Sequence, residues 1–78
     1  MRINTINIKD DQHLGHTIRD RRKTLQLTQK DVATYCQLSV NGLSQIELGN
    51  KSIRLGTLLK LSKMLGFEVC LSMENITS

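Results

Sequence analysis

Residues 28–49 read TQKDVATYCQLSVNGLSQIELG, and this stretch decides the fold of the chain. It has the pattern of two short helices separated by a tight break. Thr28 is a suitable N-cap, and Asp31, three residues later, supplies an acidic variant of the capping box. Three small or apolar residues then recur with the spacing of one helical face: Val32, Ala33 and Cys36. The stretch therefore begins with a capped amphipathic helix.

A second helix is predicted after the interruption at residues 36–38. Ser39 offers a second N-cap, and Leu43 and Ile46 give this helix its buried side. Small Ala33 would let the two helices approach closely. Two short helices joined by such a turn form a helix-turn-helix, whose second helix enters the major groove of DNA.

Two further helices flank this pair, and no second domain is indicated. The first is predicted over residues 12–25, and the last over residues 55–65, where Gly66 suits the left-handed residue that ends a helix. We therefore expect a mainly α, four- to five-helix domain over residues 12–66.

The predicted N-terminal arm, residues 1–11, carries a weaker signal. Ile6 and Ile8 alternate with Asn7, a pattern that fits either a short strand or a disordered arm. At the other end of the chain, residues 74–78 are expected to form a flexible tail.

Residues 67–73, FEVCLSM, alternate between apolar and other residues, which predicts a short β-strand. Its apolar face consists of Phe67, Val69, Leu71 and Met73. A lone strand leaves its backbone groups unpaired, so it needs a partner. The N-terminal arm is one candidate, and the same strand of a second chain is the other. We favour the second chain, because antiparallel pairing about a two-fold axis gives a homodimer with one self-complementary interface.

The charge distribution favours a polyanionic partner. The net charge is +4, but nine basic residues lie between Arg19 and Lys63 against three acidic ones, a local excess of six positive charges. The 78 residues are too few for an enzyme with an enclosed active site, and no pair of residues suggests a nucleophile and its base. No apolar run approaches the roughly twenty residues that span a bilayer.

The cysteines and histidines give no sign of a cofactor or metal. Cys36 and Cys70 lack CxxC spacing, which predicts free, mostly buried thiols in a reducing cytoplasm. His13 and His16 could share a helix face, but no Cys or carboxylate at ligand spacing accompanies them. No Gly-rich phosphate loop is present. We therefore expect a cytoplasmic, non-enzymatic protein with no cofactor.

The segments TQKDVA, Leu38-Ser39 and LSQIELGNK resemble the phage-repressor/Cro (Xre) helix-turn-helix family over roughly residues 14–66. Two positions depart from its pattern: Cys36 stands where Leu is usual, and Gln37 where many members have Gly, although Gln can adopt left-handed backbone at modest cost. The stretch LGTLLKLSKMLGFEV is similar to the HipB-type antitoxins. That resemblance implies a dimeric repressor that binds palindromic operators of its own operon, with a HipA-type Ser/Thr kinase toxin as its partner.

The exposed positions at the start of the recognition helix are expected to read DNA bases. These are Val40 and Asn41, with Gln45 one turn later. Asn and Gln can bond adenine N6 and N7 together, and Val can contact a thymine methyl group. The family resemblance places Gln29 on a phosphate, where the free amides of a helix N-terminus would help. The further phosphate candidates are Ser39, Ser44, Asn50, Lys51 and Arg22.

Glu47 is an acid in a region expected to meet phosphate. In the Xre family an acid at the matching position pairs with a basic residue of the first helix, here Arg22. The resemblance thus implies a structural ion pair that orients Arg22 and neutralises Glu47.

Three functions follow from these expectations. The first is an operator-binding repressor that is also an antitoxin, and the second is a plain Xre regulator without a toxin partner. The third is an interaction module that has lost DNA binding. The basic centre and the intact base-reading positions argue against the third.

Overall fold

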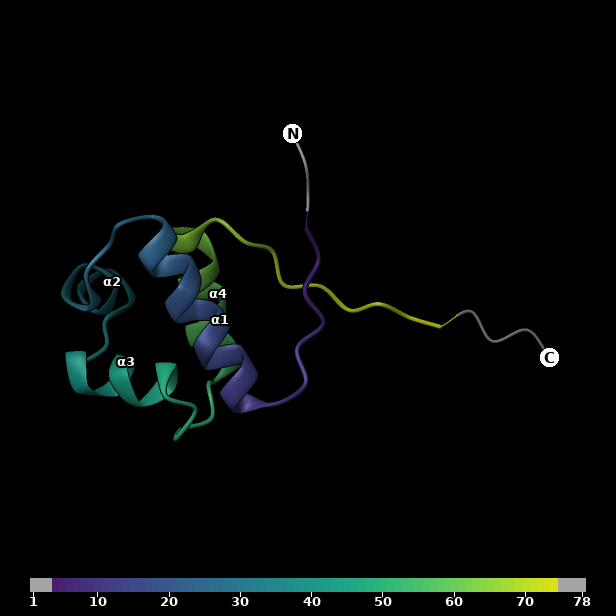
Figure 1. Ribbon diagram of the computed structural model, residues 1–78, viewed down its shortest axis with the longest axis horizontal. Coiled ribbons are helices and arrows are strands. Elements are labelled where there is room, and N and C mark those ends of the chain that lie inside the picture. Colours follow the sequence, from purple (N-terminus) through teal and green to yellow (C-terminus); the bar gives the residue numbers. More distant parts are fainter. Residues whose placement is uncertain (1–3, 75–78) are drawn as a thin grey trace.

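The computed structural model describes residues 4–74, and the chain in this range is built from four helices. Along the sequence they are α1 (Asp11–Thr24), α2 (Gln29–Cys36), α3 (Val40–Glu47) and α4 (Leu55–Leu65). In Figure 1, α2 and α3 lie on one side of α1 and α4, and the C-terminal segment leaves on the opposite side. The predicted mainly α fold with four helices is confirmed.

Side chains at the helix starts explain why the helix-turn-helix begins where it does. The Thr28 hydroxyl accepts a hydrogen bond from the Asp31 amide, and the Thr28 amide donates to the Asp31 carboxylate, both at 3.0 Å. This reciprocal pair is the predicted capping box. The Ser39 hydroxyl caps α3 by a single hydrogen bond, which it accepts from the Gly42 amide at 2.8 Å. Short-range hydrogen bonds therefore set both N-termini.

The turn between α2 and α3 passes through a left-handed residue. Gln37 has φ of 58° and ψ of 41°, where a Cβ atom costs some conformational energy. The Gln37 side chain accepts a hydrogen bond from the Lys60 ammonium group of α4 at 2.9 Å. A contact with α4 therefore holds this residue in the turn.

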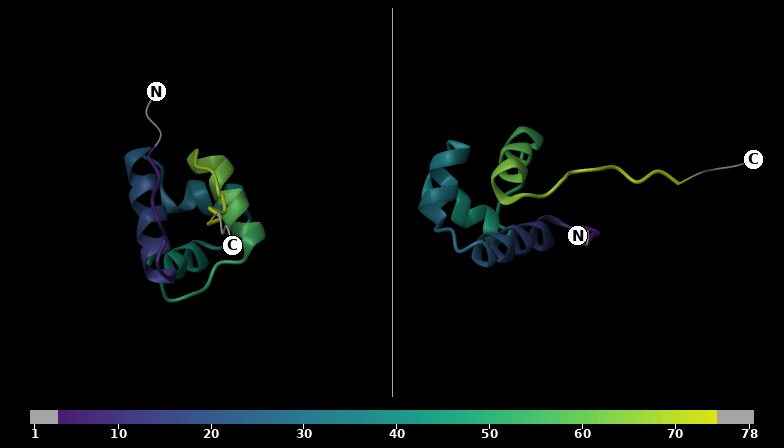
Figure 2. Two further views of the ribbon diagram at one scale, coloured as in Figure 1. Left: turned by 90° about the vertical axis from the view of Figure 1, so that its right-hand side faces the viewer. Right: turned by 90° about the horizontal axis from the view of Figure 1, so that it is seen from above.

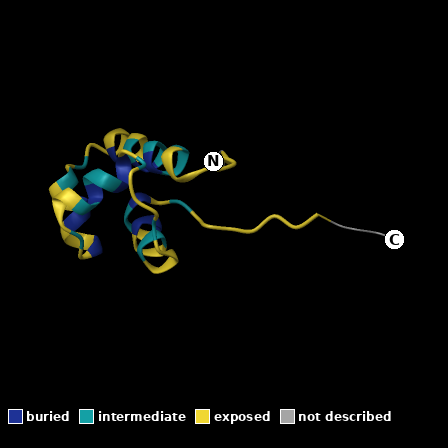
Figure 3. Ribbon diagram, turned by 90° about the horizontal axis from the view of Figure 1, so that it is seen from below, coloured by how far each residue is buried: buried dark blue, intermediate teal, exposed yellow. Residues whose placement is uncertain are grey.

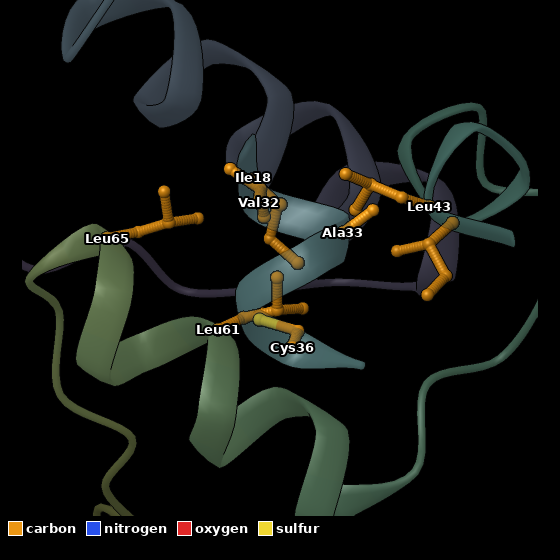
Figure 4. Close-up of a cluster of buried hydrophobic side chains, with 8 residues drawn as sticks. Ile18, Val32, Ala33, Cys36, Leu43, Leu61 and Leu65 are labelled. Carbon is orange, nitrogen blue, oxygen red and sulfur yellow. The ribbon is translucent and has the colours of Figure 1, made fainter. Parts of the chain in front are cut away.

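The hydrophobic core lies where the four helices meet, and all four contribute to it. Its buried members are Ile18, Val32, Ala33, Cys36, Leu43, Ile46, Leu61 and Leu65. Figure 4 shows side chains from α2 and α4 pointing toward one another between the helices. The residues expected on the buried faces of α2 and α3 are thus the ones that pack inside.

Close packing of α1 on α3 depends on a glycine. A Cβ atom built at Gly15 would collide with the Ile46 carbonyl oxygen and lie 3.1 Å from that of Glu47. The absence of a side chain lets the two helices approach more closely than ordinary residues allow. This approach fixes the position of α3 against the rest of the domain.

The expected β-strand is not supported by the structure. Residues 67–74 have no regular secondary structure, and Figure 2 shows the segment extending away from the helices. Within it, Val69 is 42% exposed, Leu71 84% and Met73 78%. The described part of the N-terminal arm before α1, residues 4–10, also contains no strand, so no pairing with the arm is present among the described residues. The physical reason is that a strand needs a partner, and this single chain provides none in its described residues.

The two cysteines lie in different surroundings. Cys36 is buried in the core as expected, and desolvation raises the pKa of its thiol, which favours the unreactive protonated form. Cys70 is exposed, so the expectation of two mostly buried thiols is wrong for this residue. It lies in the segment that leaves the domain, which Figure 3 shows as exposed beyond its partly buried start.

The remaining expectations for the ends of the chain fall partly outside the described residues. Residues 1–3 of the arm and residues 75–78 of the tail are not described. Across residues 4–74, no helix is long and apolar enough to cross a membrane.

Candidate nucleic-acid interface

The helix α3 has one face in the core and one toward solvent. Leu43, Ile46 and Glu47 are buried between the helices. At its start, Val40 is 45% exposed and Asn41 is also exposed. The Ser39 cap fixes this first turn, so the exposed side chains project from a rigid helix end.

Gln45, the third expected base-reading residue, lies one turn along α3 and is partly exposed. Its side-chain oxygen accepts a hydrogen bond from the Asn50 side-chain amide at 3.2 Å. The Asn50 backbone amide also donates to the Gln45 carbonyl, at 3.0 Å. Asn50, which was expected to bind a phosphate, thus contacts the expected base-reading side chain of Gln45 in the free protein.

The expected phosphate-binding residue Gln29 is the first residue of α2 and is partly buried. Its side-chain amide donates a hydrogen bond to Glu47 Oε1 at 3.0 Å. The structure therefore joins the N-terminus of α2 to the end of α3 through two side chains. Sequence reasoning gave no indication of this contact.

Arg22 and Glu47 form a two-pronged ion pair inside the domain. Arg22 Nε lies 2.7 Å from Glu47 Oε2, and Arg22 Nη2 lies 2.9 Å from Glu47 Oε1. The hydrogen bonds to Glu47 raise the pKa of Arg22 against the opposing effect of desolvation. With 8% and 1% of their surfaces exposed, the two residues belong to the interior. The fold thus brings together the two residues that the resemblance paired.

Arg22 does not lie where a phosphate ligand would be expected. Its third nitrogen, Nη1, donates to the Leu27 carbonyl at 2.9 Å, so each guanidinium nitrogen has a partner within the domain. Because the side chain is buried, the structure gives Arg22 an architectural position between α1, α2 and α3. This inward position of the Arg22 side chain differs from the expectation that Arg22 also faces the DNA backbone.

The other expected phosphate ligands lie around α3. Ser39 is exposed, with its hydroxyl oxygen engaged in the cap, and Ser44 is partly exposed on the helix. Lys51 is exposed in the loop after α3. The neighbouring Ser52 donates to the Asp11 carboxylate at 2.9 Å, which ties this loop to the start of α1.

The expected dimerisation residues do not lie together on the domain. Phe67 is partly buried against the core, where its backbone amide donates to the Ser62 carbonyl at 3.1 Å. Val69, Leu71 and Met73 lie farther along the exposed segment. The segment is anchored at Phe67 and extends from that point.

Two further contacts were missed by sequence reasoning. Arg21 Nε donates to the Leu65 carbonyl at 2.7 Å, which satisfies a free acceptor at the end of α4. Gly15 makes the close contact with α3 described above. A glycine inside a helix costs about 1 kcal/mol relative to alanine, so its presence in α1 was a usable signal of close packing.

No group of three His, Cys, Asp or Glu within residues 4–74 could hold a metal ion. The His13 ring accepts a hydrogen bond from the Lys9 amide at 3.2 Å, at the start of α1.

A helix-turn-helix family model of the Xre/Cro-like type matches residues 18–70, which cover the second half of α1 and all of α2, α3 and α4. The chain belongs to the Xre/Cro-like helix-turn-helix family. A search of curated proteins finds no match to it. Members of the family are DNA-binding transcriptional regulators and are usually non-enzymatic. Within this family α2 and α3 are the helix-turn-helix, and α3 is its recognition helix.

Proposed function

We propose that this protein is a sequence-specific transcriptional repressor that binds palindromic operators as a homodimer. The observation that carries the proposal is the solvent face of α3, where Val40 and Asn41 lie on a capped first turn and Gln45 follows one turn later. Two of these side chains are amides, which can distinguish bases by paired hydrogen bonds. The third is an apolar side chain suited to a thymine methyl group.

Phosphate contacts would orient α3 in the groove. Gln29 is the first residue of α2, and the free backbone amides at this helix N-terminus favour a bound anion. Ser39, Ser44, Lys51 and Asn50 lie on or next to α3 and would supply the remaining contacts. The local excess of six positive charges between Arg19 and Lys63 adds attraction that does not depend on base sequence.

A homodimer would form through residues 67–73. The apolar side chains of Val69, Leu71 and Met73 are exposed in the single chain, which favours a partner that covers them. Two identical segments pairing antiparallel would complete each other's hydrogen bonds. The dimer would place two recognition helices on half-sites about one DNA turn, or roughly 34 Å, apart.

We propose further that the repressor is the antitoxin of a HipA-type Ser/Thr kinase toxin in the cytoplasm and regulates its own operon. The support is the resemblance of residues 55–69, LGTLLKLSKMLGFEV, to the HipB-type antitoxins. A plain Xre-family regulator without a toxin partner is the alternative, and the family match covers both equally.

A gel shift on the protein's own promoter tests the DNA-binding proposal. A dimer touching roughly 6–10 phosphates should lose about 10³–10⁵ in affinity between 50 and 200 mM salt. Affinity that is flat over this range, or equal for promoter and scrambled DNA, would reject sequence-specific binding. A pull-down from the native host separates the two forms of the proposal: a co-purifying kinase supports the antitoxin, and its absence supports the plain regulator.

A further inference from the structure

We propose that Glu47 is a positioning residue for DNA binding: it holds the Gln29 amide in the orientation that meets phosphate. The proposal rests on the function proposed above and names a role beyond the ion pair. Glu47 itself would not touch DNA, because only 1% of its surface is exposed. It would act through Gln29, the first residue of α2.

The geometry consists of one carboxylate shared by two donors. Glu47 Oε1 accepts from Arg22 Nη2 at 2.9 Å and from Gln29 Nε2 at 3.0 Å. Glu47 Oε2 accepts from Arg22 Nε at 2.7 Å. The ion pair therefore fixes the carboxylate, and the fixed carboxylate in turn determines where the Gln29 amide lies.

The shared contact leaves Gln29 able to bind phosphate. A glutamine amide carries two N–H donors, and the bond to Glu47 uses one of them. The other N–H remains free to donate. Because hydrogen bonds to an ionised acceptor are stronger than neutral ones, Glu47 can hold this side chain at an otherwise partly exposed position.

The charges explain why an acid can serve next to a phosphate site. An unpaired carboxylate would repel the DNA backbone, but the guanidinium of Arg22 contacts both Glu47 oxygens and neutralises the charge. Arg22 therefore acts together with Glu47. It donates no hydrogen bond to DNA, but its positive charge allows the Glu47 carboxylate to lie near the DNA polyanion.

Ordering of Gln29 before DNA arrives also lowers the cost of binding. A free glutamine side chain must give up rotamer freedom when it contacts phosphate. If Glu47 has already restricted the side chain, the rotamer entropy is lost when the protein folds and no longer opposes DNA binding. The benefit would be the same for every DNA sequence, since phosphate contacts carry no base information.

The first test measures the free protein by NMR. In the full 78-residue chain, the Gln29 side-chain NH₂ group should be ordered on the nanosecond scale, with the exposed Gln26 side chain as internal reference. This measurement needs no variant and no DNA. A Gln29 amide as mobile as that of Gln26 would overturn the positioning role, whether or not the protein binds DNA.

A matched pair of variants separates positioning from simple support of the fold. In Arg22→Met/Glu47→Leu, the apolar variant, both charges are replaced together, which is often tolerated in protein interiors. In Arg22→Met/Glu47→Gln, the amide variant, position 47 keeps an acceptor oxygen. We expect Gln29 to lose its order in the apolar variant and to regain it in the amide variant. Urea unfolding checks that both variants fold.

The second test adds DNA to the same proteins. In the parent, Gln29→Ala should weaken binding to any duplex by about fivefold, the equivalent of one net hydrogen bond. In the apolar variant the same substitution should change affinity by less than about twofold, because Gln29 is no longer held. An equal factor in both backgrounds would overturn the proposal.

The two proposals fail in different ways. A parent protein that binds no DNA would overturn the repressor function and the positioning role together. A parent that binds its operator with a mobile Gln29 amide would overturn the positioning role alone. If the apolar variant does not fold, the amide variant alone is compared with the parent by NMR. It keeps an acceptor for Gln29 without leaving the charge of Arg22 unpaired, so loss of Gln29 order in the folded amide variant would count against positioning by that acceptor.

Discussion

The backbone of Gly15 in α1 lies directly against the Ile46 carbonyl in α3. A methyl group at Gly15 would collide with that oxygen and would also stand 3.1 Å from the Glu47 carbonyl. Backbone atoms at such a contact cannot move aside as a flexible side chain could. The position of the recognition helix therefore depends on a missing side chain in the first helix.

Gly15→Ala is expected to destabilise the protein despite the better helix propensity of alanine. Overpacking of this kind costs about 1–3 kcal/mol, and here the obstructing atoms belong to backbone. Gly56→Ala in α4 is the matched control, because nothing lies within 4 Å of its added methyl group. That control should be stabilised by about 0.5–1 kcal/mol. Urea unfolding of both proteins checks this, and a stable Gly15→Ala variant would show that α1 and α3 can separate.

The Arg22–Glu47 pair predicts non-additive effects on stability. Removing either partner leaves a buried charge unpaired, so each single alanine substitution should cost about 3–5 kcal/mol. The double variant should cost clearly less than the sum of the two. A double-mutant cycle by denaturant unfolding measures this difference. A coupling energy near zero would mean that the interaction between Arg22 and Glu47 does not stabilise the fold.

Substitutions on α3 are expected to change sequence preference. Asn41→Ala and Gln45→Ala should each cost about 1–3 kcal/mol on the cognate operator and relax discrimination against altered bases. Gln29→Ala should instead weaken binding to cognate and scrambled DNA by the same factor. Competition gel shifts with both DNAs distinguish these patterns. If Gln45→Ala behaved as the parent does on both, Gln45 would have no part in base reading.

The capping box predicts a specific loss of stability in acid. The hydrogen bond from the Thr28 amide is the main cause that lowers the pKa of Asp31 below its ordinary value of 3.8. A carboxyl with a lowered folded-state pKa stabilises the protein above the unfolded value, and this stabilisation is lost as the pH falls through the folded value. Asp31→Asn should remove this part of the pH dependence. Unfolding curves measured across the acid range compare the two proteins, and equal acid sensitivity would contradict the prediction.

The C-terminal segment predicts how the chains associate. Val69→Lys places a charge among the expected interface residues and should give monomers with much weaker operator binding, because the two half-sites are no longer linked. Ser72→Lys is the matched control on the opposite side of the alternation, and should leave the dimer intact. Sedimentation equilibrium distinguishes the two. A dimer that survives deletion of residues 67–78 would show that the helices hold the chains together.

Local sequence was sufficient to define the helices. The starts of α2 and α3 follow from Thr28 with Asp31 and from Ser39, because a capping side chain acts on amides only three residues away. The buried faces follow from periodicity, since 3.6 residues complete each turn. The left-handed backbone of Gln37 fits the family resemblance, in which many members have Gly at this position.

The tertiary structure decided what the sequence left open, because these features depend on residues far apart in the chain. The sequence did not indicate that Gly15 lies against Ile46, that Gln29 bonds to Glu47, or that Arg22 is turned inward with every nitrogen engaged. For residues 67–73 the alternation of side chains predicted a strand, yet the single chain leaves the segment unpaired. The pattern of side chains can favour an extended backbone, but only a hydrogen-bonding partner makes that backbone part of a sheet.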